Sequence, residues 1–231
     1  MEATAGHNRR QPNFKRRLQD FLEAILEKDP TFEDHETNSL LHLSIIRTDL
    51  GKFEKALGDA DFARTQLNRR NADGKSPIFL TIEHGRTDMF NRLFTAYAPL
   101  IDWRSKDSIH GNTPLHMACL QENVQAAEKI FKHEPQLCMI PNFLGRSPFF
   151  LASQRRNLDL LGIFEGWKSK AVTVQDYLGE NMLFVCARAG DVEMFNWFTG
   201  NNNFFLARGQ QNYKGQTIEH VVCLEGKTSI V

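Results

Sequence analysis

Cysteine is scarce in this sequence. Its four cysteines, Cys119, Cys138, Cys186 and Cys223, are widely spaced, and no two of them form a C-x-x-C pair. This spacing argues against a disulfide framework and favours a reducing compartment. We therefore predict an intracellular, cytoplasmic protein, while nuclear entry and delivery into a host cell stay open.

Long apolar runs and an excess of one charge are also missing. No run approaches the roughly 18 apolar residues that would span a bilayer, and residues 1–20 lack the apolar core of a signal peptide. The 28 basic and 28 acidic residues cancel, which excludes a protein that coats nucleic acid with its whole surface. The 41% hydrophobic and 24% charged residues exclude global disorder.

A short motif recurs along the chain. Its clearest copy is G-N-T-P-L-H-M-A at 111–118, with weaker copies at 74–81 and 145–152 and diverged ones at 37–44, 179–184 and 215–220. The hydroxyl or Asn residue of each copy falls at positions 39, 76, 113, 147, 181 and 217, so the spacings are 37, 37, 34, 34 and 36 residues. Such regularity is the signature of a repeat architecture.

Each copy predicts a turn followed by two helices. Asp or Asn before Gly marks a tight turn, and Ser or Thr before Pro predicts an N-cap with Pro at the first helical position. We expect the first helix to end at a residue that tolerates a left-handed backbone, namely Gly85, Asn123, Asn157 or Gly190. A second amphipathic helix follows. One unit cannot bury its own apolar face, so the units must stack.

This pattern resembles the ankyrin repeat, whose G-x-T-P-L-H-x-A signature is matched fully at 111–118. The resemblance covers about residues 34–226 and implies an all-α, ankyrin-repeat helical solenoid of stacked helix-turn-helix units with β-turn tips. The signature His is present at 42, 116 and 220 and is replaced by Phe at 79, 150 and 184. Glu122 and Arg156 stand where the family has a Gly closing the first helix, so distorted turns are expected there.

The domain boundaries follow from the repeats. We predict a disordered leader over 1–12, an N-terminal capping helix over 13–33, and the array over 34–231, with units starting near 34, 71, 108, 142, 176 and 212. The sixth unit stops after its first helix, which fits either a shortened last repeat or a chain cut from a longer protein. An uncovered apolar face of Val221, Val222 and Leu224 favours the cut chain.

Catalytic and metal chemistry find little support. His116 and Cys119 lie three residues apart and could share a helix face as metal ligands or as a thiol with its base. The resemblance instead implies that His116 hydrogen-bonds within and between neighbouring turns and that Cys119 packs inside the first helix. Cys138 could be an exposed reactive thiol. No phosphate-binding glycine loop is present, so we predict no enzyme, no cofactor and no metal, with a thiol enzyme using Cys138 or Cys119 as a further alternative.

The turn tips suggest a binding surface. Tips normally carry polar residues, but the residues just before the turn glycines are apolar or aromatic in three successive units. Exposed residues of this kind form interface hot spots, although the tips could also fold inward or pack on one another. With the first-helix positions behind them, the candidate contact residues are Ile109, His110, Asn112, Gln121, Phe143, Leu144, Arg146, Gln154, Arg155, Tyr177, Leu178, Glu180 and Arg188.

Together these features predict a protein-protein interaction module, an adaptor, scaffold or targeting domain. Its expected partner is a protein with an apolar anchor flanked by acidic groups, because Arg146, Arg155 and Arg188 would lie beneath the aromatic tips. We expect a monomer that binds no nucleic acid. The alternative is an N-terminal recognition domain of a larger enzyme, or of a secreted microbial effector acting on host proteins, with catalysis outside this chain.

Overall fold

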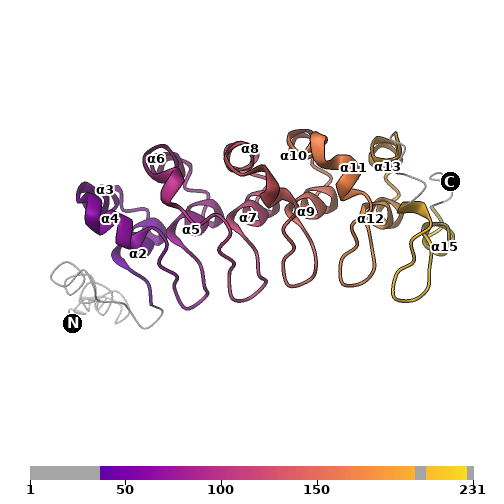
Figure 1. The fold of residues 1–231 in the computed structure, drawn as a ribbon, viewed down its shortest axis with the longest axis horizontal. Helices are drawn as coiled ribbons and strands as arrows, with labels where there is room; N and C mark the ends of the chain where they lie inside the picture. Colours follow the sequence, from indigo (N-terminus) through magenta and orange to yellow (C-terminus); the bar gives the residue numbers. More distant parts are fainter. Residues whose placement is uncertain (1–36, 201–206, 228–231) are drawn as a thin grey trace, which may run out of the picture.

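The repeated units form a single stack of helices. The computed structural model describes residues 37–200 and 207–227, and in these ranges it contains helices and turns but no strand. The all-α solenoid predicted from the repeats is confirmed. The predicted leader over 1–12 and capping helix over 13–33 lie outside the described residues. The units follow one another in chain order, so each contacts its neighbours in sequence (Figure 1).

The helices lie in two rows, with the turn tips extending from the first row (Figure 1). The first row consists of α2 (Leu40–Arg47), α5 (Pro77–Glu83), α7 (Pro114–Leu120), α9 (Pro148–Gln154), α12 (Met182–Ala189) and α15 (Ile218–Leu224). The second row consists of α3 (Leu50–Gly58), α4 (Ala60–Gln66), α6 (Thr87–Tyr97), α8 (Val124–His133), α10 (Leu158–Ile163), α11 (Lys168–Ala171) and α13 (Val192–Thr199). Short 3-10 helices follow at η1 (Ala98–Leu100), η2 (Pro135–Met139) and η3 (Glu165–Trp167).

The first-row helices begin as the Ser/Thr-Pro pairs predict. Pro occupies the start of α5, α7 and α9, where its missing N–H costs no hydrogen bond. The hydroxyl oxygens of Thr113 and Ser147 accept backbone N–H groups of the first turn. Each capped helix start therefore fixes the direction in which the chain leaves its tip.

The turns that close the first-row helices are regular, contrary to the distortion expected at Glu122 and Arg156. Glu122 has φ 53° and Arg156 has φ 56°, close to the φ of 64° at Gly85 and 69° at Gly190. The hydrogen bonds are also the same, because Glu122 N–H reaches the Cys119 carbonyl as Gly190 N–H reaches that of Ala187. The stack thus imposes the left-handed turn on residues that do not favour it.

The two asparagines expected to take the left-handed position do something else. Asn123 and Asn157 are the N-caps of α8 and α10, and their side-chain oxygens each accept a backbone N–H at 3.0 Å. The expectation was wrong by one residue because Asn serves both as a left-handed cap and as an N-cap.

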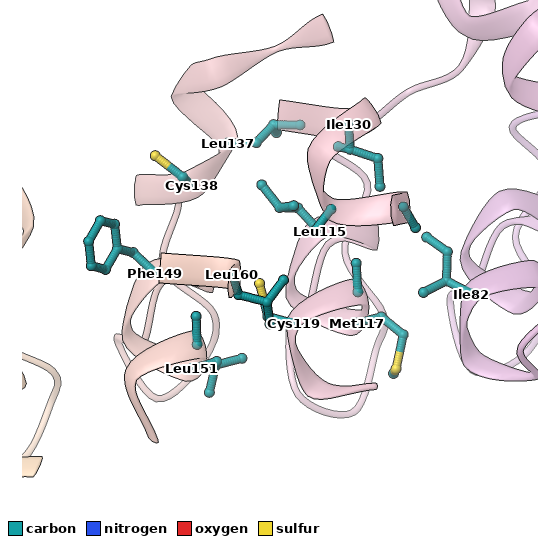
Figure 2. Close-up of a cluster of buried hydrophobic side chains, with 14 of the residues drawn as sticks. Ile82, Leu115, Met117, Cys119, Ile130, Leu137, Cys138, Phe149, Leu151 and Leu160 are labelled. Carbon is teal, nitrogen blue, oxygen red and sulfur yellow. The ribbon is translucent and has the colours of Figure 1, made fainter. Parts of the chain in front are cut away.

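The core runs between the rows without interruption. Between the third and fourth units, Leu115, Ile130 and Leu137 are fully buried and lie close together (Figure 2). Consecutive first-row helices pack directly on each other from α2 to α15. Because every unit buries its apolar residues partly on its neighbours, the stack positions all its tips as one body.

The sixth unit is better covered than the sequence suggests. Val221 and Val222 are 2% and 1% exposed, so the prediction of an uncovered face at these residues is wrong. Leu224 is 72% exposed. Glu219 occupies the position that is a buried apolar residue, such as Leu115 or Leu183, in the earlier units, and it forms an ion pair with Arg208. A charged pair therefore stands at a position that is apolar in the earlier units.

Candidate partner-binding surface

Each turn tip is organised by an Asn or Asp side chain. The Asn142 Oδ1 accepts the backbone N–H groups of Leu144 at 2.9 Å and Arg146 at 3.1 Å, while Gly145 has φ 76°. The same arrangement recurs at positions 71, 107, 176 and 212. Sequence reasoning missed these residues, which are buried at 107, 142, 176 and 212, although their regular placement before each turn glycine was a readable signal.

Backbone hydrogen bonds join the tips to one another. The Phe143 N–H donates to the His110 carbonyl at 2.8 Å, the Tyr177 N–H to that of Leu144 at 3.0 Å, and the Tyr213 N–H to that of Leu178 at 3.0 Å. One such bond links each successive pair from the second tip to the sixth. The tips therefore form a row with fixed spacing.

Large apolar side chains lie along this row. We call the tip ridge the set of exposed residues Ile109, Phe143, Leu144, Tyr177, Leu178 and Tyr213, whose exposed fractions run from 52% to 78%. Exposed apolar residues scattered singly are ordinary, but a contiguous set indicates a contact surface. Sequence reasoning identified all of these except Tyr213 as contact residues.

The aromatic rings of the ridge also contact the preceding tip. A Cβ placed on Gly111 would lie 2.5 Å from the Phe143 ring, and one on Gly145 would lie 2.7 Å from the Tyr177 ring. Each ring thus covers a glycine with one face. Phe143 and Tyr177 nevertheless remain 54% and 58% exposed as residues, so the tips pack on one another without turning inward.

The third tip is one residue longer than the others. Ser108 donates the tip-to-tip hydrogen bond, to the Asp73 carbonyl at 2.7 Å, and it lies against Gly74 as Phe143 lies against Gly111. Ile109 is therefore the inserted residue. Counting back from the turn glycine made it equivalent to Phe143, and that alignment is wrong. Ile109 is 58% exposed and still belongs to the ridge.

His116 has a structural environment. Its Nδ1 lies 2.8 Å from the Thr113 hydroxyl and 3.1 Å from the Thr113 backbone nitrogen, and its Nε2 lies 3.0 Å from the Arg146 carbonyl oxygen. Burial lowers the pKa of His116 to about 4. The neutral ring thus ties the third unit to the fourth tip, which leaves neither nitrogen for a metal or for proton transfer.

The cysteine chemistry considered from the sequence is disfavoured by burial. Cys119 and Cys138 are both completely buried, so the alternative of an exposed thiol at Cys138 is wrong. Burial raises the pKa of the Cys138 thiol to about 12 and that of Cys119 still further, which disfavours the nucleophilic thiolate. Among the described residues, no group of three or more His, Cys, Asp or Glu could hold a metal ion.

The polar candidates divide into exposed and buried groups. His110, Gln121, Gln154, Arg155 and Arg188 are exposed beside or behind the ridge. Asn112 and Glu180 are buried between tips, where Asn112 accepts a hydrogen bond from the Asn142 side chain at 2.9 Å and Glu180 binds Arg188. These two residues support the surface from beneath.

The three arginines predicted to lie beneath the aromatic tips differ in their charge environment. The Arg146 Nε lies 3.0 Å from the Asp176 carboxylate. Arg188 is paired with Glu180 and lies 3.6 Å from Glu225. Arg155 has no carboxylate partner among the residues that the structure describes. Most of the positive charge on this face is therefore neutralised within the chain.

One groove lies beside the ridge, between the third and fourth tips and the helices behind them. Its volume is about 320 Å³. Six candidate residues line it: Ile109, His110, Asn112, Leu144, Arg146 and Gln154. Sequence reasoning missed the other seven, which are Lys75, Glu83, Asp107, Met117, Leu120, Asn142 and Leu151.

Comparison with known proteins agrees with the geometry. The family model described as ankyrin repeat matches residues 110–134. Two relatives from Microplitis demolitor bracovirus, the I-Kappa-B like proteins C2 and I1, are 28% and 27% identical over 134 residues, covering 56% of this chain and 72% and 78% of the relatives.

A chain in the solved complex of the predatory endopeptidase Bd0816 from Bdellovibrio bacteriovorus with the immunity protein Bd3460 has a similar fold. The two share a TM-score of 0.68 at 21% identity, over 83% of this chain and 94% of the other. None of the helices described here is both long and apolar enough to cross a membrane.

Proposed function

This chain belongs to the ankyrin-repeat family, and from that premise we propose that it is a non-catalytic adaptor or targeting module that binds a protein partner along the tip ridge. The observation that carries the proposal is the ridge itself, a fixed row of half-exposed apolar and aromatic side chains. Because hydrogen bonds already fix the backbone of this row, binding costs little backbone entropy. Aromatic anchors at such positions are typical of binding hot spots.

The comparisons support the same class of function. The solved complex contains an immunity protein associated with an endopeptidase, and the curated relatives are named as I-Kappa-B like proteins. The burial of Cys119 and Cys138 also disfavours the thiol-enzyme alternative. The four free thiols suit the reducing, intracellular compartment in which we expect the partner.

Partner binding is tested with a ridge variant. The wild-type chain and the Phe143→Ala/Tyr177→Ala variant are used as baits in a cell extract, proteins retained only by the wild type are identified, and their affinities are measured by calorimetry. We expect the double variant to lose several kcal/mol of binding free energy, about two or three for each buried aromatic anchor.

Two further variants separate binding from folding. Leu178→Asp alters the ridge at a residue that covers no glycine, and it should also abolish binding. Leu50→Ala removes a side chain that is 54% exposed on α3, away from the ridge, and should bind as the wild type does. Unchanged affinity in both ridge variants, with melting temperatures near that of the wild type, would rule out the ridge as the binding surface.

A further inference from the structure

The groove beside the ridge has an apolar interior. Met117 and Leu120 come from α7 and Leu151 from α9, while the exposed side chains of Ile109 and Leu144 line it from the tips. A space of about 320 Å³ lies at the lower end of the range for binding pockets. It therefore suits one or two side chains of a partner.

The polar groups at one side of the groove are already satisfied. The Asp107 carboxylate accepts the backbone N–H groups of Ile109 at 2.9 Å, His110 at 2.6 Å and Asn112 at 3.0 Å. The Lys75 ammonium lies 2.8 Å from the Glu83 carboxylate and 3.4 Å from that of Asp73. These groups gain little from a charged ligand, because each already has an internal counterpart.

The cation on the other side is also occupied. The Arg146 Nε lies 3.0 Å from the Asp176 carboxylate, and its guanidinium carbon lies 5.5 Å from the centre of the Phe150 ring. The Asp176 side chain is only 1% exposed. An acidic group on the partner would have to compete with this buried carboxylate, and separating the pair would leave a charge without its counterpart.

We propose that this groove receives an uncharged apolar side chain, such as Leu, Ile, Met or Phe, from a polypeptide segment of the partner. The inference rests on the function proposed above and narrows its chemistry, because it places the partner's anchor in the groove without acidic residues around it. Arg155, which has no carboxylate partner among the described residues, lies behind the ridge and does not line the groove. Apolar contact sets the affinity here, so salt has little effect.

The probe is a phage-displayed library of random dodecapeptides, selected on the full chain. Leu120→Glu places a carboxylate in the groove, and Leu224→Glu is its matched control, since Leu224 holds the same helical position in the sixth unit and is exposed. Leu144→Glu, at an exposed residue of the tip, gives a second groove variant that does not disturb the core. Melting temperatures confirm that all variants fold.

We expect enriched peptides with apolar residues and no surplus of Asp or Glu. Leu224→Glu should bind them as the wild type does, whereas Leu120→Glu and Leu144→Glu should bind them at least about tenfold more weakly. Raising the salt concentration from about 50 to 500 mM should change the affinity less than about threefold, because no exposed ion pair is formed.

Three results would overturn the inference: an acidic consensus with strong salt dependence, equal binding by the groove variants, or no enrichment at all. Any of these, found together with loss of partner binding in the Phe143→Ala/Tyr177→Ala variant, would refute the chemistry of the groove while leaving the ridge as the binding surface. If instead the ridge variants bind the partner as tightly as the wild type does, the proposed function is refuted.

Discussion

Acid should destabilise this array through the buried His116. Burial lowers the pKa of His116 in the folded chain from its ordinary 6.5 to about 4. Between these two values the unfolded chain binds a proton that the folded chain does not, so stability rises with pH there. The stabilisation is fully present above about pH 6.5 and is lost progressively as the pH falls toward 4.

The magnitude follows from the two pKa values. The difference between 6.5 and about 4 corresponds to roughly 3 kcal/mol over the whole range, since each pKa unit is about 1.4 kcal/mol. At pH 4.5 most of this has been lost, because His116 is nearly fully protonated in the unfolded chain. We therefore expect His116 alone to lower the free energy of unfolding by about 2–3 kcal/mol between pH 8 and pH 4.5.

The array supplies its own control substitution. Phe occupies the position of His116 in three other units, as Phe79, Phe150 and Phe184, and all three are buried. His116→Phe should therefore fold, with a loss at pH 8 of roughly 1–3 kcal/mol for the missing hydrogen bonds. The His116→Phe variant should lack the acid-dependent loss of stability assigned to His116. The His110→Asn variant, which changes an exposed histidine, should retain that loss.

Urea unfolding followed by circular dichroism between pH 8 and pH 4.5 measures the effect. The carboxylates titrate in every variant, so only the difference between the wild type and His116→Phe reports on His116. Parallel stability curves for these two proteins would refute the assignment of acid sensitivity to this ring.

Three smaller predictions concern the turns and the thiols. Gly215→Ala should lower the free energy of unfolding by about 1 kcal/mol because of the left-handed backbone. Gly111→Ala should lower it by at least about 1 kcal/mol more, because the new Cβ would meet the Phe143 ring at 2.5 Å. Equal losses in urea unfolding would contradict the ring contact. Glu122→Gly should raise the free energy of unfolding by roughly 0.5 kcal/mol, because φ there is 53°; a lower stability would argue against strain. In the native protein a thiol reagent should modify Cys223 quickly and the three buried cysteines only on unfolding; fast labelling of a second thiol would contradict their burial.

Local chemistry explains why the fold could be predicted. Thr113-Pro114 specifies a helix start through a cap and a fixed φ, and both effects act within a few residues. The periodic spacing of these starts then requires stacking, since one hairpin cannot cover its own apolar face. The first step depends on neighbouring residues and the second on a regular spacing, so both were readable from the sequence.

Several errors arose where packing between elements overrides local preference. Glu122 adopts a left-handed turn because the packed helices on both sides hold it there, which no local preference indicates. Cys138 lies in a connecting segment but is completely buried in the core, on the side of Phe149 (Figure 2). The pairing of Arg146 with Asp176 joins residues 30 positions apart. The neutralisation of the Arg146 charge therefore could not be predicted from either position alone.

The tip aromatics show how folding and binding requirements can be separated. The third tip makes the same backbone hydrogen bond as the fourth with Ser108 in the place of Phe143, so tip stacking does not require a ring. The ring of Phe143 covers Gly111 with one face yet keeps 54% of its residue surface exposed. Exposed aromatic surface that the stack does not need adds nothing to folding and costs solubility. Contact with another molecule is the role that we propose for this exposed surface, which is why the ridge carries the functional proposal.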